Sequence, residues 1–572
     1  MKKLLTCLLC LALTVYCAAA LAYTAGEYTV TAQGNNGPVE VKVTFDEGSI
    51  LAVEVLSHSE TPGICDPAIE RIPAAIVAGQ TLALDTVSGA TFTSRAILTA
   101  VEEAVTLAGG DVNALKAAPG EETAAAEDEE LTVDVVVLGG GAAGIGAAAN
   151  AKDAGASVLL LEKQSHLGGN TLLSGGLIYA TGTSFQKEAG VEDSVEALVE
   201  YWQTRAEGHA NADLLTLVAE KSSETIEWLQ AGGVVLTGPG TAGTSPVPRM
   251  QSTNVGGSGF ILPMTETIKA KGVEIRLDTP AVGLLTDDAG AVIGVLAQAA
   301  DGHKVTVHAK SVVIATGGYD GNQEMMRKYS PSYADEFMYA NVGNTGDGIR
   351  FAMELGADTV FHDGIIGLRG TRPTSFADPL NGFVWMPYLM VNQFGERFTN
   401  ETLDYPILHS RLVESGTHHS FMIFDGTQGS HDMFAQLIDE GYVFEADTLG
   451  ELAEKTFMDK DTFLKTVARY NELKGQEDAD FGKDASAMTG VGDGPYFALR
   501  IRPATIGTLG GIKIDLDMHV LRKDGTAIPN LYAAGACANG EFFYREYPAS
   551  GTSIMMCFTT GRIAGTNAAE GK

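Results

Sequence analysis

Basic residues are scarce in this sequence. Its 572 residues include 38 basic and 72 acidic side chains, which give a formal charge of −34 at pH 7. Nucleic acid and anionic membrane surfaces would repel such a chain, so we expect no nucleic-acid partner. A small acidic substrate would need arginine side chains placed locally around it.

Cysteine is also scarce. Of six cysteines, three lie within the first 17 residues, which leaves Cys65, Cys537 and Cys557. Three scattered cysteines cannot form a disulfide framework, and the chain has no Cys-x-x-Cys-His sequence to attach haem. The histidines show no spacing typical of metal ligands. We therefore expect neither a c-type haem nor a metal site.

A marked apolar run lies at the N-terminus. Residues 1–22 begin with Lys2 and Lys3, continue with a short apolar stretch and end in Ala20-Leu21-Ala22, a small-residue cleavage pattern. The stretch is short for a membrane span. We predict a cleaved signal peptide over residues 1–22 and an extracytoplasmic protein, with an uncleaved membrane anchor as the alternative.

The length predicts several domains, because one hydrophobic core rarely serves 572 residues. Within residues 23–112, the stretch 28–60 alternates apolar and polar side chains as strands do, and a predicted helix from Ser94 to Leu107 closes the region. This pattern is typical of a small α+β domain. Residues 113–131 are small and acidic, which predicts a linker.

The next region has the order strand, glycine turn, helix, strand and acid. An apolar strand over residues 133–138 runs into Gly139, Gly141 and Gly144, and a second strand ends at Glu162. Such glycines allow a tight turn, close approach of a pyrophosphate and close helix packing, while the acid accepts hydrogen bonds from a ribose. We predict a Rossmann-like nucleotide-binding domain. It is discontinuous, over residues 132–320 and 500–572, with an α+β capping domain inserted over residues 321–499.

The segment from Asp85 to Ser94 resembles the flavinylation motif of FMN-binding domains, which occur in sodium-translocating quinone reductases and related electron carriers. Residues 60–63, Glu-Thr-Pro-Gly, extend the match upstream. The resemblance implies FMN attached to Thr93 through a phosphoester, with a flavin transferase as a partner. The alternative is a Ser/Thr-rich cap of the helix predicted to begin at Ser94.

From Asp134 to the C-terminus the chain resembles the FAD domain of the soluble fumarate reductase family, which includes flavocytochrome c fumarate reductase, urocanate reductase and, more distantly, ketosteroid dehydrogenases. The resemblance implies a non-covalent FAD. The residues that it implies for FAD binding are Gly139, Gly141, Ala143, Gly144, Glu162, Lys163, Gly168, Gly169, Asn170, Thr171, Ser174, Gly175, Gly176, Thr316, Gly317, Gly535, Ser550, Gly551, Ser553 and Ile554.

In this family a hydride passes from the flavin to an activated double bond and an arginine supplies the proton. Residues 395–401 match the segment that carries this arginine, which implies Arg397 as the proton donor. The alternative is a structural pair between Arg397 and Glu401, four residues apart. Arg545 falls near the arginine that holds the substrate carboxylate in the family and is the second predicted catalytic residue.

Two departures from the family pattern argue against fumarate itself. The run 506–511 lacks the histidine that holds a carboxylate in fumarate reductases, and the usual proton relay is replaced around residues 380–385. Apolar and aromatic replacements favour a larger substrate with one carboxylate. The predicted substrate contacts are Arg369, Tyr544, Tyr547 and Gly551, and core packing is the alternative role for the aromatic residues.

Together these features predict an exported anaerobic reductase. A membrane-associated donor would reduce FMN, FMN would reduce FAD, and FAD would reduce the C=C bond of a small unsaturated carboxylate. One alternative is a dehydrogenase of a steroid-like or saturated substrate. The string Tyr547-Pro548-x-x-Gly551 resembles a motif of such enzymes, whereas the retention of Arg397 argues against this alternative. The other alternative is an extracellular flavin electron carrier.

Overall fold

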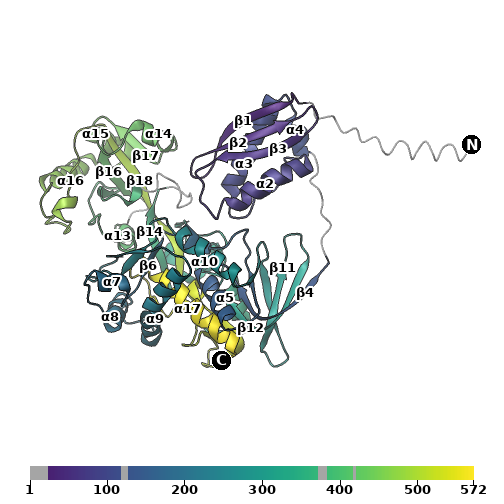
Figure 1. Ribbon diagram of the computed structural model, residues 1–572. Coiled ribbons are helices and arrows are strands. Elements are labelled where there is room, and N and C mark those ends of the chain that lie inside the picture. Colours follow the sequence, from purple (N-terminus) through teal and green to yellow (C-terminus); the bar gives the residue numbers. More distant parts are fainter. Residues whose placement is uncertain (1–22, 118–126, 372–382, 417–419) are drawn as a thin grey trace, which may run out of the picture. The chain divides into compact units, whose positions relative to one another are not determined.

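The computed structural model describes residues 23–117, 127–371, 383–416 and 420–572. The chain divides into two compact units, Met1–Ala124 and Ala125–Lys572, which are described one at a time (Figure 1). This division falls within the predicted linker, residues 113–131. The predicted signal peptide lies outside the described residues. No helix in the described part of the chain is both long and apolar enough to cross a membrane.

The first unit is a three-stranded antiparallel sheet with helices packed against it (Figure 1). Val39, Val41 and Val43 alternate along the middle strand, and all three are fully buried in one core with the helices. Leu115 is buried in the same core, so the first residues of the predicted linker belong to this unit. The elements are β1 (Gly26–Gln33), β2 (Pro38–Phe45), β3 (Ile50–Ser57), α2 (Asp66–Gly79), α3 (Thr91–Leu107) and α4 (Val112–Ala117).

The second unit contains an eight-stranded sheet. Six of its strands have the order β10-β11-β12-β4-β5-β9, and β20 pairs with both β12 and β19. The neighbours β12, β4, β5 and β9 pair in parallel, as does β20 with β12. The strands are β4 (Glu129–Leu138), β5 (Val158–Leu161), β9 (Glu274–Arg276), β10 (Ala281–Thr286), β11 (Val292–Gln298), β12 (Lys304–Ile314), β19 (His519–Leu521) and β20 (Ala527–Ala533).

Two helices of this sheet domain pack against each other at very close range. A Cβ added to Gly561 or Gly565 of α17 (Thr552–Glu570) would lie 2.1 Å from the carbonyl oxygen of Ala143 or Ala147 on α5 (Ala142–Asp153). The glycines therefore let the two backbones touch, and α17 runs along α5 in Figure 1. The other helices of this part are α6 (Gly169–Leu173), α7 (Ser184–Glu188), α8 (Val195–Arg205), α9 (Ala212–Ala231) and α10 (Ser258–Ala270).

A second large sheet forms around the 17-residue strand β18 (Tyr496–Ile512). The first half of β18 pairs with β16 and β17, and its second half pairs with β13 and β14. The predicted domain boundary at residue 500 thus falls inside one continuous strand. The other strands are β13 (Phe337–Met338), β14 (Thr359–Gly370), β15 (Leu389–Asn392), β16 (Ser420–Asp425) and β17 (Val443–Ala446).

In the described part of the chain, the α-helices α11 to α16 accompany this sheet, and a small three-stranded sheet completes the unit. Helix starts follow local capping rules: the side chains of Thr448 and Asp459, for example, accept backbone N–H groups of α15 and α16. The α/β architecture, with an α+β unit before it, confirms the predicted fold class. The remaining elements are α11 (Gln323–Tyr329), α12 (Asp347–Glu354), α13 (Tyr405–Glu414), α14 (His431–Asp439), α15 (Leu449–Thr456), α16 (Lys460–Glu472), β6 (Leu177–Tyr179), β7 (Thr237–Gly240) and β8 (Met250–Ser252).

Candidate flavin and substrate sites

The glycine turn after β4 leaves no room for a Cβ at Gly139 or Gly144. Gly139 has a φ of 98°, and a Cβ there would lie 2.5 Å from the carbonyl oxygen of Ala315. A Cβ at Gly144 would lie 1.8 Å from the carbonyl oxygen of Gly139. The turn can therefore bring the first N–H groups of α5 to the end of the sheet, where a phosphate group binds favourably.

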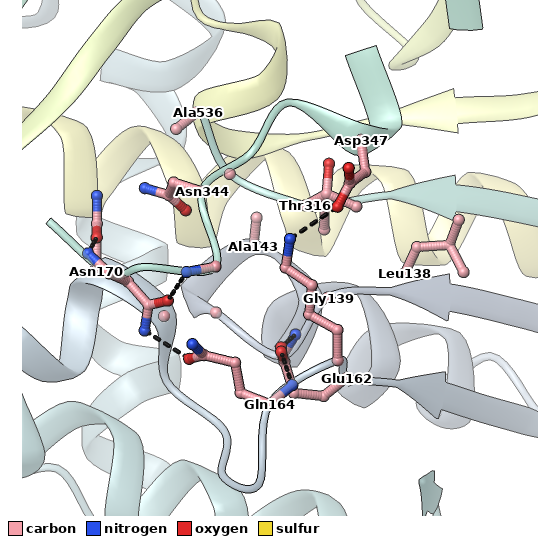
Figure 2. Close-up of a pocket in the computed structure, with 18 of the residues that line it drawn as sticks. Leu138, Gly139, Ala143, Glu162, Gln164, Asn170, Thr316, Asn344, Asp347 and Ala536 are labelled. Carbon is pink, nitrogen blue, oxygen red and sulfur yellow. Dashed lines mark hydrogen bonds and ion pairs between the residues drawn. The ribbon is translucent and has the colours of Figure 1, made fainter. Parts of the chain in front are cut away.

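A cavity of about 110 Å³ opens at this turn, between the ends of β4, β5 and β12 (Figure 2). Glu162 lines it, and its two carboxylate oxygens accept the backbone N–H groups of Gly140 at 2.7 Å and Gln164 at 2.9 Å. Burial raises the pKa of Glu162, and the two N–H bonds oppose that effect. The carboxylate shapes the turn and still has free lone pairs for a ribose.

Polar side chains from three segments complete this cavity. Lys163 forms an ion pair with Asp347, which is labelled in Figure 2, and their Nζ and Oδ2 atoms are 2.7 Å apart. Asn170 accepts the backbone N–H of Asn341 at 2.6 Å. The hydroxyl of Thr316 is buried and has no hydrogen-bond partner within the described part of the chain. A dinucleotide fits this cradle, because it would supply the missing partner and fill the space that the glycines leave open.

Most residues predicted to bind FAD line this cavity or the neighbouring one. Gly144, Gly168, Gly176 and Gly535 do not, but a Cβ at any of the four would lie 2.6 Å or less from another part of the chain. The lining residues among the predicted set are Gly139, Gly141, Ala143, Glu162, Lys163, Gly169, Asn170, Thr171, Thr316 and Gly317 in the first cavity, and Asn170, Thr171, Ser174, Gly175, Ser550, Gly551, Ser553 and Ile554 in the second.

The second cavity has a volume of about 310 Å³ and is mainly apolar. It shares Asn170, Thr171, Ala536 and Cys557 with the first cavity, so the two adjoin. No lysine, arginine, histidine or carboxylate occurs among its described lining residues. Its large side chains are Leu173, Leu177, Tyr339, Ile366, Trp385, Tyr405, Ile506, Tyr547 and Ile554.

Tyr547 is one of the residues that line this apolar cavity. Its hydroxyl oxygen accepts the backbone N–H of Ser553 at 2.7 Å, in the first turn of α17, where the helix dipole favours negative charge. Burial raises the pKa of Tyr547, while the N–H groups of Ser553 and Gly551 favour its ionised form. The hydroxyl proton therefore points away from Ser553 and can be donated to a bound molecule.

Tyr405 lies beside Tyr547, with ring centroids 6.4 Å apart and the rings nearly parallel. Burial also raises the pKa of Tyr405 well above its ordinary value. Asp404, which precedes it, accepts hydrogen bonds from the hydroxyl of Ser550 at 2.7 Å and from the backbone N–H of Gly243 at 2.8 Å. These bonds tie the start of α13 to the Ser550 loop and so hold the two tyrosines together.

Arg397 lies in a buried cluster of charges. Its Nε and Nη2 atoms donate to both oxygens of Glu401, at 2.9 and 3.0 Å, and Nη2 is 2.7 Å from Oδ2 of Asp478. Lys483 pairs with Glu401 from the other side at 3.0 Å. Arg397 does not line either cavity. The pair with Glu401, which the sequence left open as the alternative, is thus present, with Asp478 added.

The other predicted substrate residues differ in their surroundings. Arg369 is buried, its Nη1 atom lies 3.2 Å from the sulfur of Met390, and its Nε atom has no partner among the described residues. Burial lowers its pKa to about 10, and its Cζ atom is 5.8 Å from the centroid of the Trp385 ring. Arg545 is exposed, and the ring of Tyr544 stacks on His209. Arg369, Arg545 and Tyr544 all lie outside the described linings of both cavities.

In the first unit, Thr93 is the third residue of α3 and is only 3% exposed. Its hydroxyl donates to Oε2 of Glu60 at 2.5 Å, and Oε1 of Glu60 accepts the backbone N–H of Asn36 at 2.8 Å. The helix begins at Thr91, three residues earlier than predicted, and its N-cap is Ala90, with no side-chain cap. No Ser or Thr side chain caps the start of this helix, so the alternative of a Ser/Thr-rich cap before Ser94 is wrong.

Comparison with known proteins agrees with this geometry. Residues 134–554 match the family model of the FAD binding domain, and residues 34–106 match that of the FMN-binding domain. A urocanate reductase of Eggerthella lenta is 32% identical over 95% of this chain and 92% of its own length. The chain belongs to the fumarate and urocanate reductase family of FAD-dependent oxidoreductases.

Two further members show how far this likeness extends. An NADH:acrylate oxidoreductase of Vibrio harveyi is 32% identical over 96% of this chain, and the chain spans 61% of that relative's length. The solved structure of a flavocytochrome c3 fumarate reductase in an open conformation superposes with a TM-score of 0.65, at 30% identity over 77% of this chain and 78% of that one. Both the FAD and the FMN predictions are confirmed at the level of domains.

Sequence reasoning missed Tyr339 and Tyr405 as cavity residues, and Glu60 as the partner of Thr93. Tyr405 follows Asp404 and precedes Pro406 at the start of α13, which is an ordinary helix start. Nothing in that local pattern indicates a ligand. Glu60 lay within a segment that the resemblance had already marked, so its position was a usable signal.

Proposed function

We propose that this protein is an extracytoplasmic reductase of the C=C bond of an α,β-unsaturated carboxylate with an apolar or aromatic tail. The observation that carries the proposal is the apolar cavity that adjoins the FAD pocket and is lined by Tyr547, whose hydroxyl oxygen accepts the N–H of Ser553. The chain belongs to a family of FAD-dependent reductases, and its apolar cavity adjoins the FAD pocket. Together these two features favour reduction of an apolar substrate beside the flavin.

The lining of the cavity disfavours a small dicarboxylate such as fumarate. Its described lining has no charged side chain, and a buried carboxylate without a partner is costly. The faces of Trp385, Tyr339 and Tyr405 suit an aromatic or branched tail. Arg369 is not among the described lining residues, but its guanidinium is buried beside Trp385, which does line the cavity, and its Nε is unpaired among the described residues. It is our candidate partner for a single carboxylate at the Trp385 end of the cavity.

The glycine turn, Glu162 and the N-terminus of α5 would hold FAD, which in its reduced form would supply the hydride. Tyr547 would supply the proton to the neighbouring carbon. The resulting tyrosinate would be stabilised by the N–H of Ser553 and by the positive end of the α17 dipole. The apolar wall excludes water from the reacting bond, which strengthens these interactions.

Tyr547 replaces Arg397 in this scheme. The Nε and Nη2 atoms of Arg397 both donate to Glu401, and Nη2 also forms an ion pair with Asp478. Glu401 and Asp478 raise the pKa of Arg397 despite its burial and so hold it in its charged form. These contacts support a structural role for Arg397.

The electrons would come from a membrane-associated donor and pass through FMN attached to Thr93 before they reach FAD. A flavin transferase would attach the FMN, and residues 1–22 would direct export. The match of residues 34–106 to the FMN-binding domain supports the carrier part of this scheme.

A second candidate is the reverse reaction, the dehydrogenation of a saturated or steroid-like substrate. Tyr547 and Gly551 both line the cavity, and a tyrosinate stabilised by N–H groups could accept a proton. The flavins alone would also suffice for an electron carrier without an organic substrate.

An anaerobic assay with reduced methyl viologen tests the proposal. The full-length, flavin-loaded protein is offered cinnamate, urocanate, acrylate, itaconate and fumarate, with a Gly144→Val variant as the control that cannot hold FAD. We expect dye oxidation with an aromatic monocarboxylate and a kcat/KM at least about tenfold lower with fumarate, because an unpaired buried carboxylate costs more than about 1.4 kcal/mol. A preference for fumarate would contradict the proposed substrate. Silence with every alkene, together with reduction of an oxidised dye by a saturated steroid-like substrate, would favour the dehydrogenase.

A further inference from the structure

Thr93 and Glu60 form an isolated, buried pair in the first unit. Thr93 is 3% exposed and Glu60 is 5% exposed, and the hydroxyl of Thr93 donates to Oε2 of Glu60 at 2.5 Å. The two residues are 33 positions apart, so the contact is made by the fold and not by the helix that carries Thr93. A carboxylate is the strongest acceptor that a protein offers to a hydroxyl proton.

Glu60 is held in place independently of Thr93. Its other oxygen, Oε1, accepts the backbone N–H of Asn36 at 2.8 Å, and the side chain of Asn36 bonds to Ser59 and Thr61 on either side of Glu60. A Cβ added to Gly34 would lie 2.7 Å from Oε1, so the loop between β1 and β2 closes tightly over the carboxylate. The carboxylate is thus fixed before any reaction at Thr93.

The burial of Thr93 limits what an external enzyme can do at this hydroxyl. Asp85, Ser88 and Phe92 are exposed on the motif that leads to it, and they offer a surface for a transferase. The proton of Thr93, however, already points at Glu60 inside the unit. A base within the acceptor chain can remove that proton, whereas a base of the transferase would first have to displace Glu60.

We propose that Glu60 is the general base for flavinylation of Thr93. This inference rests on the covalent attachment of FMN proposed above. The donor is FAD: the Oγ1 atom of Thr93 attacks the phosphorus of the FMN half, the pyrophosphate P–O bond breaks, and AMP leaves. The proton of Thr93 passes to Oε2 of Glu60, and FMN remains joined to Thr93 through the new phosphoester.

The test uses the full-length chain without covalent flavin, a purified flavin transferase, FAD and Mg²⁺. Attached flavin is followed over time as fluorescence of the chain on a denaturing gel, a readout independent of reductase activity. We expect Glu60→Gln to lower the kcat of attachment at least about tenfold, with little change in the KM for the chain, because glutamine can accept the hydrogen bond but not the proton. Glu60→Asp keeps a carboxylate and is expected to recover part of the rate.

The controls distinguish the role of Glu60 as a base from the covalent attachment of FMN to Thr93, on which that role depends. Glu54→Gln changes an exposed carboxylate on β3 and is expected to leave the rate unchanged. Equal thermal unfolding of Glu60→Gln and the wild type would exclude misfolding as the cause of a lower rate. No attached flavin on the wild type would overturn the attachment to Thr93 itself. Attachment lost in Thr93→Ala but unchanged in Glu60→Gln would overturn only the role of Glu60.

Discussion

The FAD pocket and the apolar cavity share four lining residues but are constructed differently. The pocket depends on the backbone: the turn from Gly139 to Gly144 and the N-terminus of α5 define its shape. The cavity depends on side chains from distant segments, among them Tyr339, Trp385 and Tyr547. A site made by backbone is encoded in a short stretch of sequence, whereas a site made by side chains is encoded only in the complete fold.

The same difference sets how each site tolerates substitution. The backbone site has positions where a single carbon atom does not fit, such as Gly144. In the cavity, one hydroxyl can be removed with the ring left in place, as at Tyr547. We therefore expect substitutions in the pocket to remove the cofactor, and substitutions in the cavity to remove a chemical step while the cofactor stays bound.

The largest effect is expected from Gly144→Ala. Its Cβ would lie 1.8 Å from the carbonyl oxygen of Gly139, so the turn must move. A shift that costs about 3 kcal/mol lowers FAD affinity by about a hundredfold, and turnover at ordinary FAD concentration should disappear. Bound FAD is measured by the ratio of flavin to protein absorbance after gel filtration. Gly283→Ala is the matched control, because a Cβ at Gly283 on β10 meets no atom within 4 Å. A normal FAD content in Gly144→Ala would show that the turn does not determine the pocket.

The next effect is expected from Tyr547→Phe. Phenylalanine keeps the ring that packs against Phe543 and Tyr405 but removes the proton that we propose for the reaction. We expect kcat to fall by about a hundredfold with FAD content unchanged. Tyr544→Phe is the matched control: its ring stacks on His209, and kcat should stay within about twofold of the wild type. Steady-state kinetics with reduced methyl viologen measure both, and an equal loss in the two variants would remove Tyr547 from the proton step.

The pocket could be predicted from sequence because its physical requirements are local. Strand, glycine turn, helix and acid follow one another within 30 residues, from Val133 to Glu162. The same holds for Thr93, whose motif is continuous. The cavity offers no such pattern, because Tyr405 stands in an ordinary helix start and Tyr547 lies 142 positions further along the chain, so the two meet only in the folded protein.

Arg397 shows how a correct motif can still leave the role of a residue open. Its spacing from Glu401 was visible in the sequence, and it was compatible with both a proton donor and a structural pair. Asp478 and Lys483, which complete the cluster, lie more than 75 positions away, beyond the reach of a local pattern. Long-range ion pairs are set by tertiary packing, so only the structure could reveal them.

The smallest effect on catalysis is expected from Arg397→Lys. Lysine keeps the charge but loses the paired hydrogen bonds to Glu401, so we expect the free energy of unfolding to fall by about 1–3 kcal/mol and kcat to stay within about twofold. Burial raises the pKa of Asp478, but Arg397 lowers it further, so the net pKa lies below its ordinary value. The pair therefore stabilises the wild type at neutral pH, and this contribution is lost as the pH falls below about 4, a decline that should be shallower in Arg397→Lys. Urea unfolding at several pH values measures this contribution of the ion pair to the free energy of unfolding. A hundredfold loss of kcat with unchanged stability would instead return Arg397 to the role of proton donor.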